Sequence, residues 1–219
     1  MNLKLYQHPL AGFCHKVLIA LYENDTPFES CLVDLGNEAS RSAFLEVWPI
    51  GKFPVLRVED RALTIPESTI IIEYLAQYHP GSTDLLPRDP ERARETRLQD
   101  RFYDQYVSAP MQTIVGDHLR PPGQNDSYGV KHAKGVLQTA YGMIERAMAT
   151  RTWATGDAFS MADCAAAPAL FFADFAEPLG DGHPHAKAYR ERLMQRPSFA
   201  RVLREAEPYM HLFPLRGKG

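Results

Sequence analysis

Residues 48–56 read Trp-Pro-Ile-Gly-Lys-Phe-Pro-Val-Leu, and this stretch joins two kinds of local structure. Its Pro-Ile-Gly segment ends the helix that we predict over residues 40–47, because proline and glycine interrupt helical hydrogen bonding. The mainly apolar residues 53–58 then predict a strand that carries Pro54 near its start. A proline in a strand often marks the end of a hydrogen-bonded ladder, and this is the simplest structural role for Pro54.

The segments on either side of this stretch alternate strand and helix patterns. Residues 3–6 alternate apolar and polar side chains with a period of two, as in a short strand. Residues 13–22 place apolar side chains at helical spacing. Further elements complete the first third of the chain: a strand over residues 28–33, a strand over 62–65 that pairs as a hairpin with 53–58, and a helix over 67–78. This order predicts an α/β domain, with helices packed against a mixed sheet.

The remainder of the chain predicts helices alone. Residues 81–90 are rich in proline, glycine and aspartate, which is typical of a linker. We therefore expect an α/β domain over residues 1–80, a linker over 81–90 and an all-α domain over 91–219. The helices expected in the second domain cover residues 91–107, 130–150, 160–175, 186–195 and 198–206.

Composition excludes several classes of function. Lys and Arg number 24 against 27 Asp and Glu, so the net charge of −3 offers no basic surface for nucleic acid or an anionic membrane. The chain has no apolar run long enough for a membrane helix, and no signal-peptide pattern at its start. Three scattered cysteines favour neither a disulfide framework nor a metal site. We expect a cytoplasmic protein without a bound metal.

A capping motif in the sequence predicts the start of one helix. Ser160 precedes Asp163 by three residues, which is a capping-box arrangement with aspartate in place of the usual glutamate. The residues that follow are small and apolar, so we expect this helix to be buried at close range.

Three segments together resemble the cytosolic glutathione transferase family: residues 48–56, the pair Glu67-Ser68, and the run Phe-Ser-Met-Ala-Asp over residues 159–163. The resemblance covers essentially the whole chain. It implies a thioredoxin-like N-terminal domain, a helical C-terminal domain and a homodimer. It also implies that the protein uses glutathione as co-substrate and joins its thiolate to a small hydrophobic electrophile, as in detoxification.

The resemblance also implies a set of glutathione-binding residues. Phe53 and Pro54 match the family's cis-proline position, where main-chain groups bind an extended peptide. Ser68 matches the residue that binds the γ-glutamyl carboxylate at a helix N-terminus, and Glu67 would hold the α-ammonium group. Ser68 could instead be a simple helix cap. Lys52 could reach either the peptide backbone or the glycine carboxylate, and Arg41 is a further candidate for that carboxylate.

Aromatic and apolar side chains predict the pocket for the electrophile. The resemblance places them where members of the family line the pocket for the electrophilic substrate, and ordinary packing between helices is the alternative explanation for each residue. The candidates are Phe13, Phe102, Tyr103, Tyr106 and Met111.

The catalytic position is where the sequence departs from the family. Ala11 stands where related proteins carry a catalytic serine or cysteine, and alanine has neither a donor nor a nucleophile. Cys14 could replace it if the start of the helix lowered the pKa of its thiol. Tyr6 lies near the position of tyrosine-type members, although a core role suits it as well. The third alternative is stabilisation of the thiolate by backbone N–H groups of residues 11–13.

These alternatives leave three functions open. The first is a glutathione transferase. The second is a glutathione-dependent disulfide reductase that forms a mixed disulfide on Cys14. The third is a non-catalytic protein that binds glutathione or assembles with a partner, which the alanine at position 11 favours.

Overall fold

The computed structural model describes residues 2–216. Its first part is the expected α/β arrangement, and a short 3₁₀ turn over Glu59–Arg61 joins the last two strands. The elements in order are β1 (Leu3–Gln7), α1 (Gly12–Glu23), β2 (Glu29–Leu32), α2 (Glu38–Val47), β3 (Val55–Val58), β4 (Leu63–Pro66) and α3 (Ser68–Tyr78).

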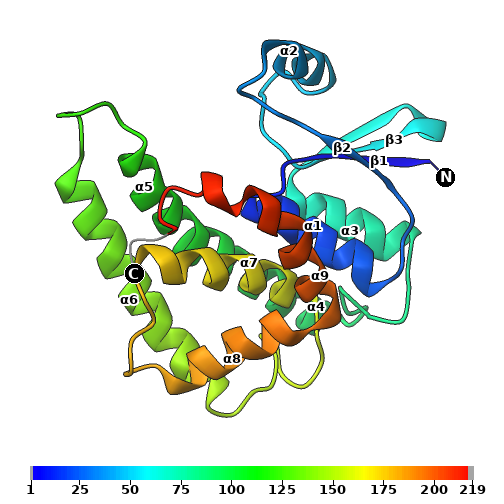
Figure 1. The fold of residues 1–219 in the computed structure, drawn as a ribbon. Helices are drawn as coiled ribbons and strands as arrows, with labels where there is room; N and C mark the ends of the chain where they lie inside the picture. Colours follow the sequence, from blue (N-terminus) through cyan, green and yellow to red (C-terminus); the bar gives the residue numbers. More distant parts are fainter. Residues whose placement is uncertain (1, 217–219) are drawn as a thin grey trace.

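The sheet has the strand order β2-β1-β3-β4. Strand β1 runs parallel to β2 and antiparallel to β3, and β3 and β4 form an antiparallel pair, so the sheet is mixed as predicted. Leu3 and Leu5 are buried in the core that includes α1 and α3, whereas Tyr6 packs against Phe44 of α2. Figure 1 shows α2 set apart on one side of the sheet, with α1 and α3 on the side that meets the helical half.

The second part is helical, with the 3₁₀ segment η3 (Glu207–Leu212) near its end. Its first helix differs from the prediction, because it continues past residue 107 through a π-helical segment into α5, which the sequence analysis missed. Pro110 lies just after the π-helical segment, where the regular hydrogen bonding of an α-helix is already interrupted. The elements are α4 (Pro90–Phe102), the π-helical segment η2 (Tyr103–Ser108), α5 (Ala109–His118), α6 (Ser127–Met148), α7 (Met161–Ala176), α8 (Pro184–Gln195) and α9 (Pro197–Ala206).

Helix α7 forms the centre of the helical half, and its capping box is confirmed. The Asp163 carboxylate accepts hydrogen bonds from the N–H of Ser160 at 2.9 Å and the N–H of Ala154 at 2.8 Å. It also accepts one from the hydroxyl of Tyr189 at 2.6 Å. Because burial disfavours its charged form, the pKa of Asp163 is raised to about 6. Asp163 therefore ties the start of α7 to the preceding loop and to α8.

A buried ion cluster joins the two halves. Lys16 of α1 is 1% exposed, and its Nζ lies 2.6 Å from Asp100 Oδ1 and 2.8 Å from Asp104 Oδ2. It also donates to Thr69 Oγ1 of α3 at 2.9 Å. Arg101 contacts both aspartates and Thr69 from the solvent side. We call these five residues the Lys16 cluster; it places α1, α3, α4 and η2 in fixed relation.

Among residues 2–216, no helix combines the length and the apolar character needed to cross a lipid bilayer.

His15 gives the fold a testable pH dependence. It is fully buried between Phe172 and Phe199, with Nε2 2.5 Å from the carbonyl oxygen of Pro9, and burial lowers its pKa to about 4. The unfolded chain takes up a proton near pH 6.5, so the free energy of unfolding should fall as pH drops from about 6.5 to about 4, by up to about 3 kcal/mol. In urea denaturation across this range, the free energy of unfolding of His15→Gln should depend less on pH than that of the wild-type protein. His132→Gln is the control, because His132 is exposed. The same pH dependence in His15→Gln as in the wild-type protein would contradict the prediction.

Candidate functional site

A polar cleft of about 170 Å³ lies where the two halves meet. It opens between the loop before β3, the start of α3 and the junction of α4 with η2. Most of the predicted binding residues line it together, although they are far apart in the sequence. The lining residues are Phe13, Trp48, Lys52, Phe53, Pro54, Pro66, Glu67, Ser68, Arg101, Asp104 and Gln105.

The main chain of Phe53 forms one wall of this cleft. The Phe53–Pro54 peptide bond is cis, as the sequence analysis expected. Strand β3 begins only at Val55, so Phe53 lies outside the ladder, and its N–H and C=O have no protein partner within residues 2–216. These two groups are free to bind the main chain of an extended peptide.

The start of α3 forms the opposite wall. The sequence alternative of Ser68 as the cap is wrong in detail, because Glu67 is the N-cap residue and Ser68 is the first residue of the helix. Ser68 is 5% exposed, and its hydroxyl has no protein partner within the described chain. Glu67 has φ of 68°, in a region that favours glycine, and such strained backbone is concentrated at functional sites. Free N–H groups and an unpaired hydroxyl suit this wall for an anion.

The floor of the cleft comes from the helical half. Arg101 and Asp104 line it, and both belong to the Lys16 cluster. The pKa of Asp104 is raised because its carboxyl group is buried, and the nearby charge of Lys16 offsets only part of this effect. Neither residue was predicted from the sequence. The four-residue spacing of Asp100 and Asp104 is a sequence signal for Asp104, whereas no local pattern singles out Arg101.

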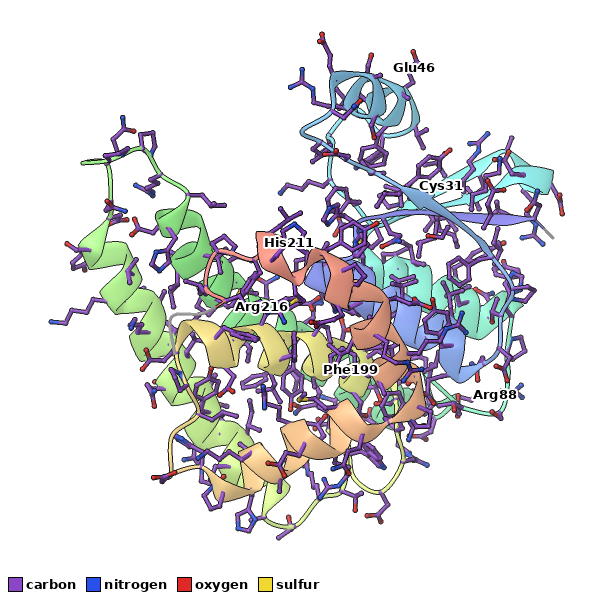
Figure 2. All side chains as sticks on the ribbon, in the orientation of Figure 1. Cys31, Glu46, Arg88, Phe199, His211 and Arg216 are labelled. Carbon is purple, nitrogen blue, oxygen red and sulfur yellow. The ribbon has the colours of Figure 1, made fainter. Side chains whose placement is uncertain are left out.

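An apolar pocket of about 540 Å³ adjoins the polar cleft and shares Phe13, Lys52 and Phe53 with it. Met111 lines this pocket, as predicted for the electrophile site. The C-terminal segment closes one side with Leu212 and Phe213, beside the region where Figure 2 labels His211. The other apolar or aromatic lining residues are Leu10, Leu35, Val115, Leu119, Phe172 and Pro214.

Ala11 lies at the boundary of the apolar pocket, directly before α1. Its own N–H donates to the carbonyl oxygen of His8 at 3.0 Å, so it is not free for a ligand. The N–H groups of Gly12 and Phe13 begin α1 and have no protein partner in the part of the chain that the structure describes. Two of the three backbone donors considered from the sequence therefore face the pocket with free hydrogen-bonding capacity.

Cys14 and Tyr6 are placed less favourably for catalysis. Cys14 is 0% exposed, and burial raises the pKa of its thiol to about 12, which opposes formation of a thiolate. Tyr6 points toward α2, contacts Phe44, and lines neither the cleft nor the apolar pocket. Burial raises the pKa of Tyr6 as well. The geometry gives both residues a packing role.

Four further candidates line neither the polar cleft nor the apolar pocket. Arg41 is exposed on α2 and lines neither cavity. Phe102 and Tyr106 line a separate groove against α6, with Tyr128, Val136 and Met143, rather than the apolar pocket. The π-helical segment that starts at Tyr103 changes the face on which the following side chains lie, which regular helical spacing did not anticipate. Tyr103 itself is buried.

Residues 2–216 contain no group of three or more His, Cys, Asp or Glu side chains that could hold a metal ion.

Comparison with known proteins places both halves in one family. Residues 5–83 match the model of the glutathione S-transferase N-terminal domain, and residues 98–192 match that of the C-terminal domain. The chain is 30% identical to FtsZ-localized protein A of Caulobacter vibrioides, over 93% of this chain and 92% of that protein. It is 27% identical to glutathione S-transferase F13 of Arabidopsis thaliana, over 92% and 95%.

A solved structure gives the same result. A glutathione S-transferase of Methylobacterium radiotolerans, crystallised with glutathione sulfonate, superimposes with a TM-score of 0.80 at 25% identity. The match covers 92% of this chain and 94% of that chain.

Cysteine labelling tests the placement of Cys14. In the native protein, we expect iodoacetamide to modify Cys31, which lies partly exposed on the edge strand β2 (Figure 2), and to leave Cys14 and Cys164 unmodified until urea unfolds the chain. Peptide mass spectrometry after oxidised glutathione treatment should likewise find no adduct on Cys14. Native modification of Cys14 would contradict its buried placement and restore the reductase alternative.

Proposed function

The chain belongs to the cytosolic glutathione transferase family, and from this premise we propose that it binds glutathione in the polar cleft and joins its thiolate to an apolar electrophile. The observation that carries the proposal is the junction of two unlike cavities. The polar cleft offers unpaired main-chain groups and a helix start, and the apolar pocket opens directly beside it. A tripeptide with charged ends suits the first cavity, and a hydrophobic molecule suits the second.

Each end of glutathione has a place in this arrangement. The γ-glutamyl carboxylate would accept hydrogen bonds from the N–H and hydroxyl of Ser68, and Glu67 would hold the ammonium group. The main chain of Phe53 would pair with the cysteinyl residue. Lys52, exposed at the boundary of the two cavities, would meet the glycine carboxylate.

In this pose, the sulfur lies toward the start of α1. We propose that the free N–H groups of Gly12 and Phe13 stabilise the thiolate, because the N-terminus of a helix favours negative charge. Catalysis then consists of positioning the two reactants and stabilising the nucleophile, without a catalytic side chain at position 11.

A non-catalytic binding protein is the second candidate. Ala11 favours it, and so does the similarity to FtsZ-localized protein A, whose name describes association with another protein rather than a reaction. The disulfide reductase is weaker, since its thiol would be the buried Cys14.

We also propose that the protein is a homodimer. Apolar side chains that are 43–58% exposed occur along α3, α4 and η2, which is a favourable composition for burial against a second copy. They are Ile70, Tyr78, Leu98 and Tyr106.

Titration calorimetry with glutathione tests the binding proposal. Ser68→Ala should weaken binding by roughly 10- to 100-fold, since a hydrogen bond to a charged group contributes about 1.5–3 kcal/mol. Ser127→Ala is the matched control, because Ser127 also begins a helix but lies exposed on α6. Equal affinities for the wild-type protein and both variants would show that Ser68 does not bind glutathione. The absence of a heat signal with the wild-type protein would contradict the binding proposal itself.

The acidity of the bound thiol separates a transferase from a binding protein. We expect ultraviolet thiolate absorbance to show the pKa of bound glutathione lowered from about 8.5 toward about 7, because of the start of α1. S-methylglutathione, which has no thiol, is the control ligand. Glutathione that binds with an unshifted thiol pKa, and without conjugation of an aryl halide, would instead support the non-catalytic candidate.

A further inference from the structure

Arg101 is the charged member of the Lys16 cluster that reaches solvent. The side chains of Lys16, Asp100 and Asp104 are at most 4% exposed, whereas that of Arg101 is 47% exposed. Its exposed side lies in the wall of the polar cleft, together with Ser68. A guanidinium group held at this point faces the start of α3 from the opposite half of the molecule.

The contacts of Arg101 leave part of its guanidinium group free. Nε and Nη2 lie 3.2 Å and 3.1 Å from Asp100 Oδ2, and Nη2 also contacts Asp104 and Thr69. Nη1 has no protein partner within residues 2–216. Arginine carries five N–H donors in a rigid plane, so one edge anchors the side chain while the two donors of Nη1 remain for a ligand.

The charges around the cleft explain why a cation is needed here. Lys16 neutralises only one of the two buried aspartates, and Glu67 adds another carboxylate to the cleft. Without Arg101, an anionic group beside Ser68 would face excess negative charge. With Arg101 in place, the cluster is neutral and presents its positive charge toward the ligand.

We propose that Arg101 pairs through Nη1 with the free α-carboxylate of the γ-glutamyl residue, and thereby makes the site selective for ligands that carry this carboxylate. The proposal rests on glutathione binding in the polar cleft. Lys16 is a positioning residue in this scheme, because it holds the two aspartates that orient Arg101. A helix of the second half then contributes directly to recognition of the peptide.

The test compares two ligands on each variant. Titration calorimetry measures glutathione and its analogue with 4-aminobutyrate in place of the γ-glutamyl residue, which has the same chain but no α-carboxylate. The proteins are wild type, Arg101→Gln, Arg101→Lys and Arg94→Gln. Arg94 is the matched control, because it lies on the same helix and is 75% exposed, and its one ion pair within residues 2–216 is with Glu91.

We expect Arg101→Gln to weaken glutathione binding by roughly 10- to 100-fold and analogue binding by less than about threefold, since only glutathione offers the carboxylate. Arg101→Lys should retain part of the preference for glutathione, and Arg94→Gln all of it. The ratio of the two affinities within one variant is independent of a general loss of folded protein.

Two results would overturn the proposal in distinguishable ways. If wild type binds glutathione and Arg101→Gln leaves the ratio of affinities unchanged, Arg101 only joins the two halves, and the proposed function survives. If wild type gives no heat with glutathione at millimolar concentration, the proposed function fails and takes the role of Arg101 with it.

Discussion

Lys16 brings a positive charge into the interior at the junction of α1, α3, α4 and η2, where the charge must be neutralised by its neighbours. An unpaired buried charge costs several kcal/mol, so Lys16 and its two aspartates are mutually required once they are buried. Because the aspartates come from the helical half, this requirement fixes the distance between the halves. The width of the polar cleft and the position of Arg101 in its wall follow from it.

The loop before α1 lies at the boundary of the apolar pocket, although its residue Ala11 has no polar side chain. Ala11 supplies no donor, yet the first N–H groups of α1 still face the apolar pocket. The buried ring of His15 contacts the carbonyl oxygen of Pro9 and thereby stabilises this loop. In the proposed function, the backbone is the remaining source of thiolate stabilisation, and the strength of that stabilisation distinguishes a transferase from a binding protein.

Local patterns in the sequence predicted the elements well wherever the pattern was self-contained. The capping box at Ser160 and Asp163 is an example, because both partners lie within one helical turn. The helix over residues 91–107 is a counterexample, since α5 continues it and the π-helical segment between them is not visible in apolar spacing. Tyr106 belongs to that segment and lines the groove against α6, whereas Met111 follows it in α5 and lines the apolar pocket.

The sequence by itself determined most of the elements and their order, because apolar spacing and capping residues act within a few positions of each other. The cis-proline at Phe53 and Pro54 and the helix start at Glu67-Ser68 were expected from the resemblance to the family, and the structure contains both. Only the tertiary structure decided that Arg101 enters the polar cleft, that Arg41 stays outside it, and that Cys14 is buried. Those outcomes depend on which distant segments pack together and on how strongly that packing desolvates each side chain. Local sequence patterns determine neither.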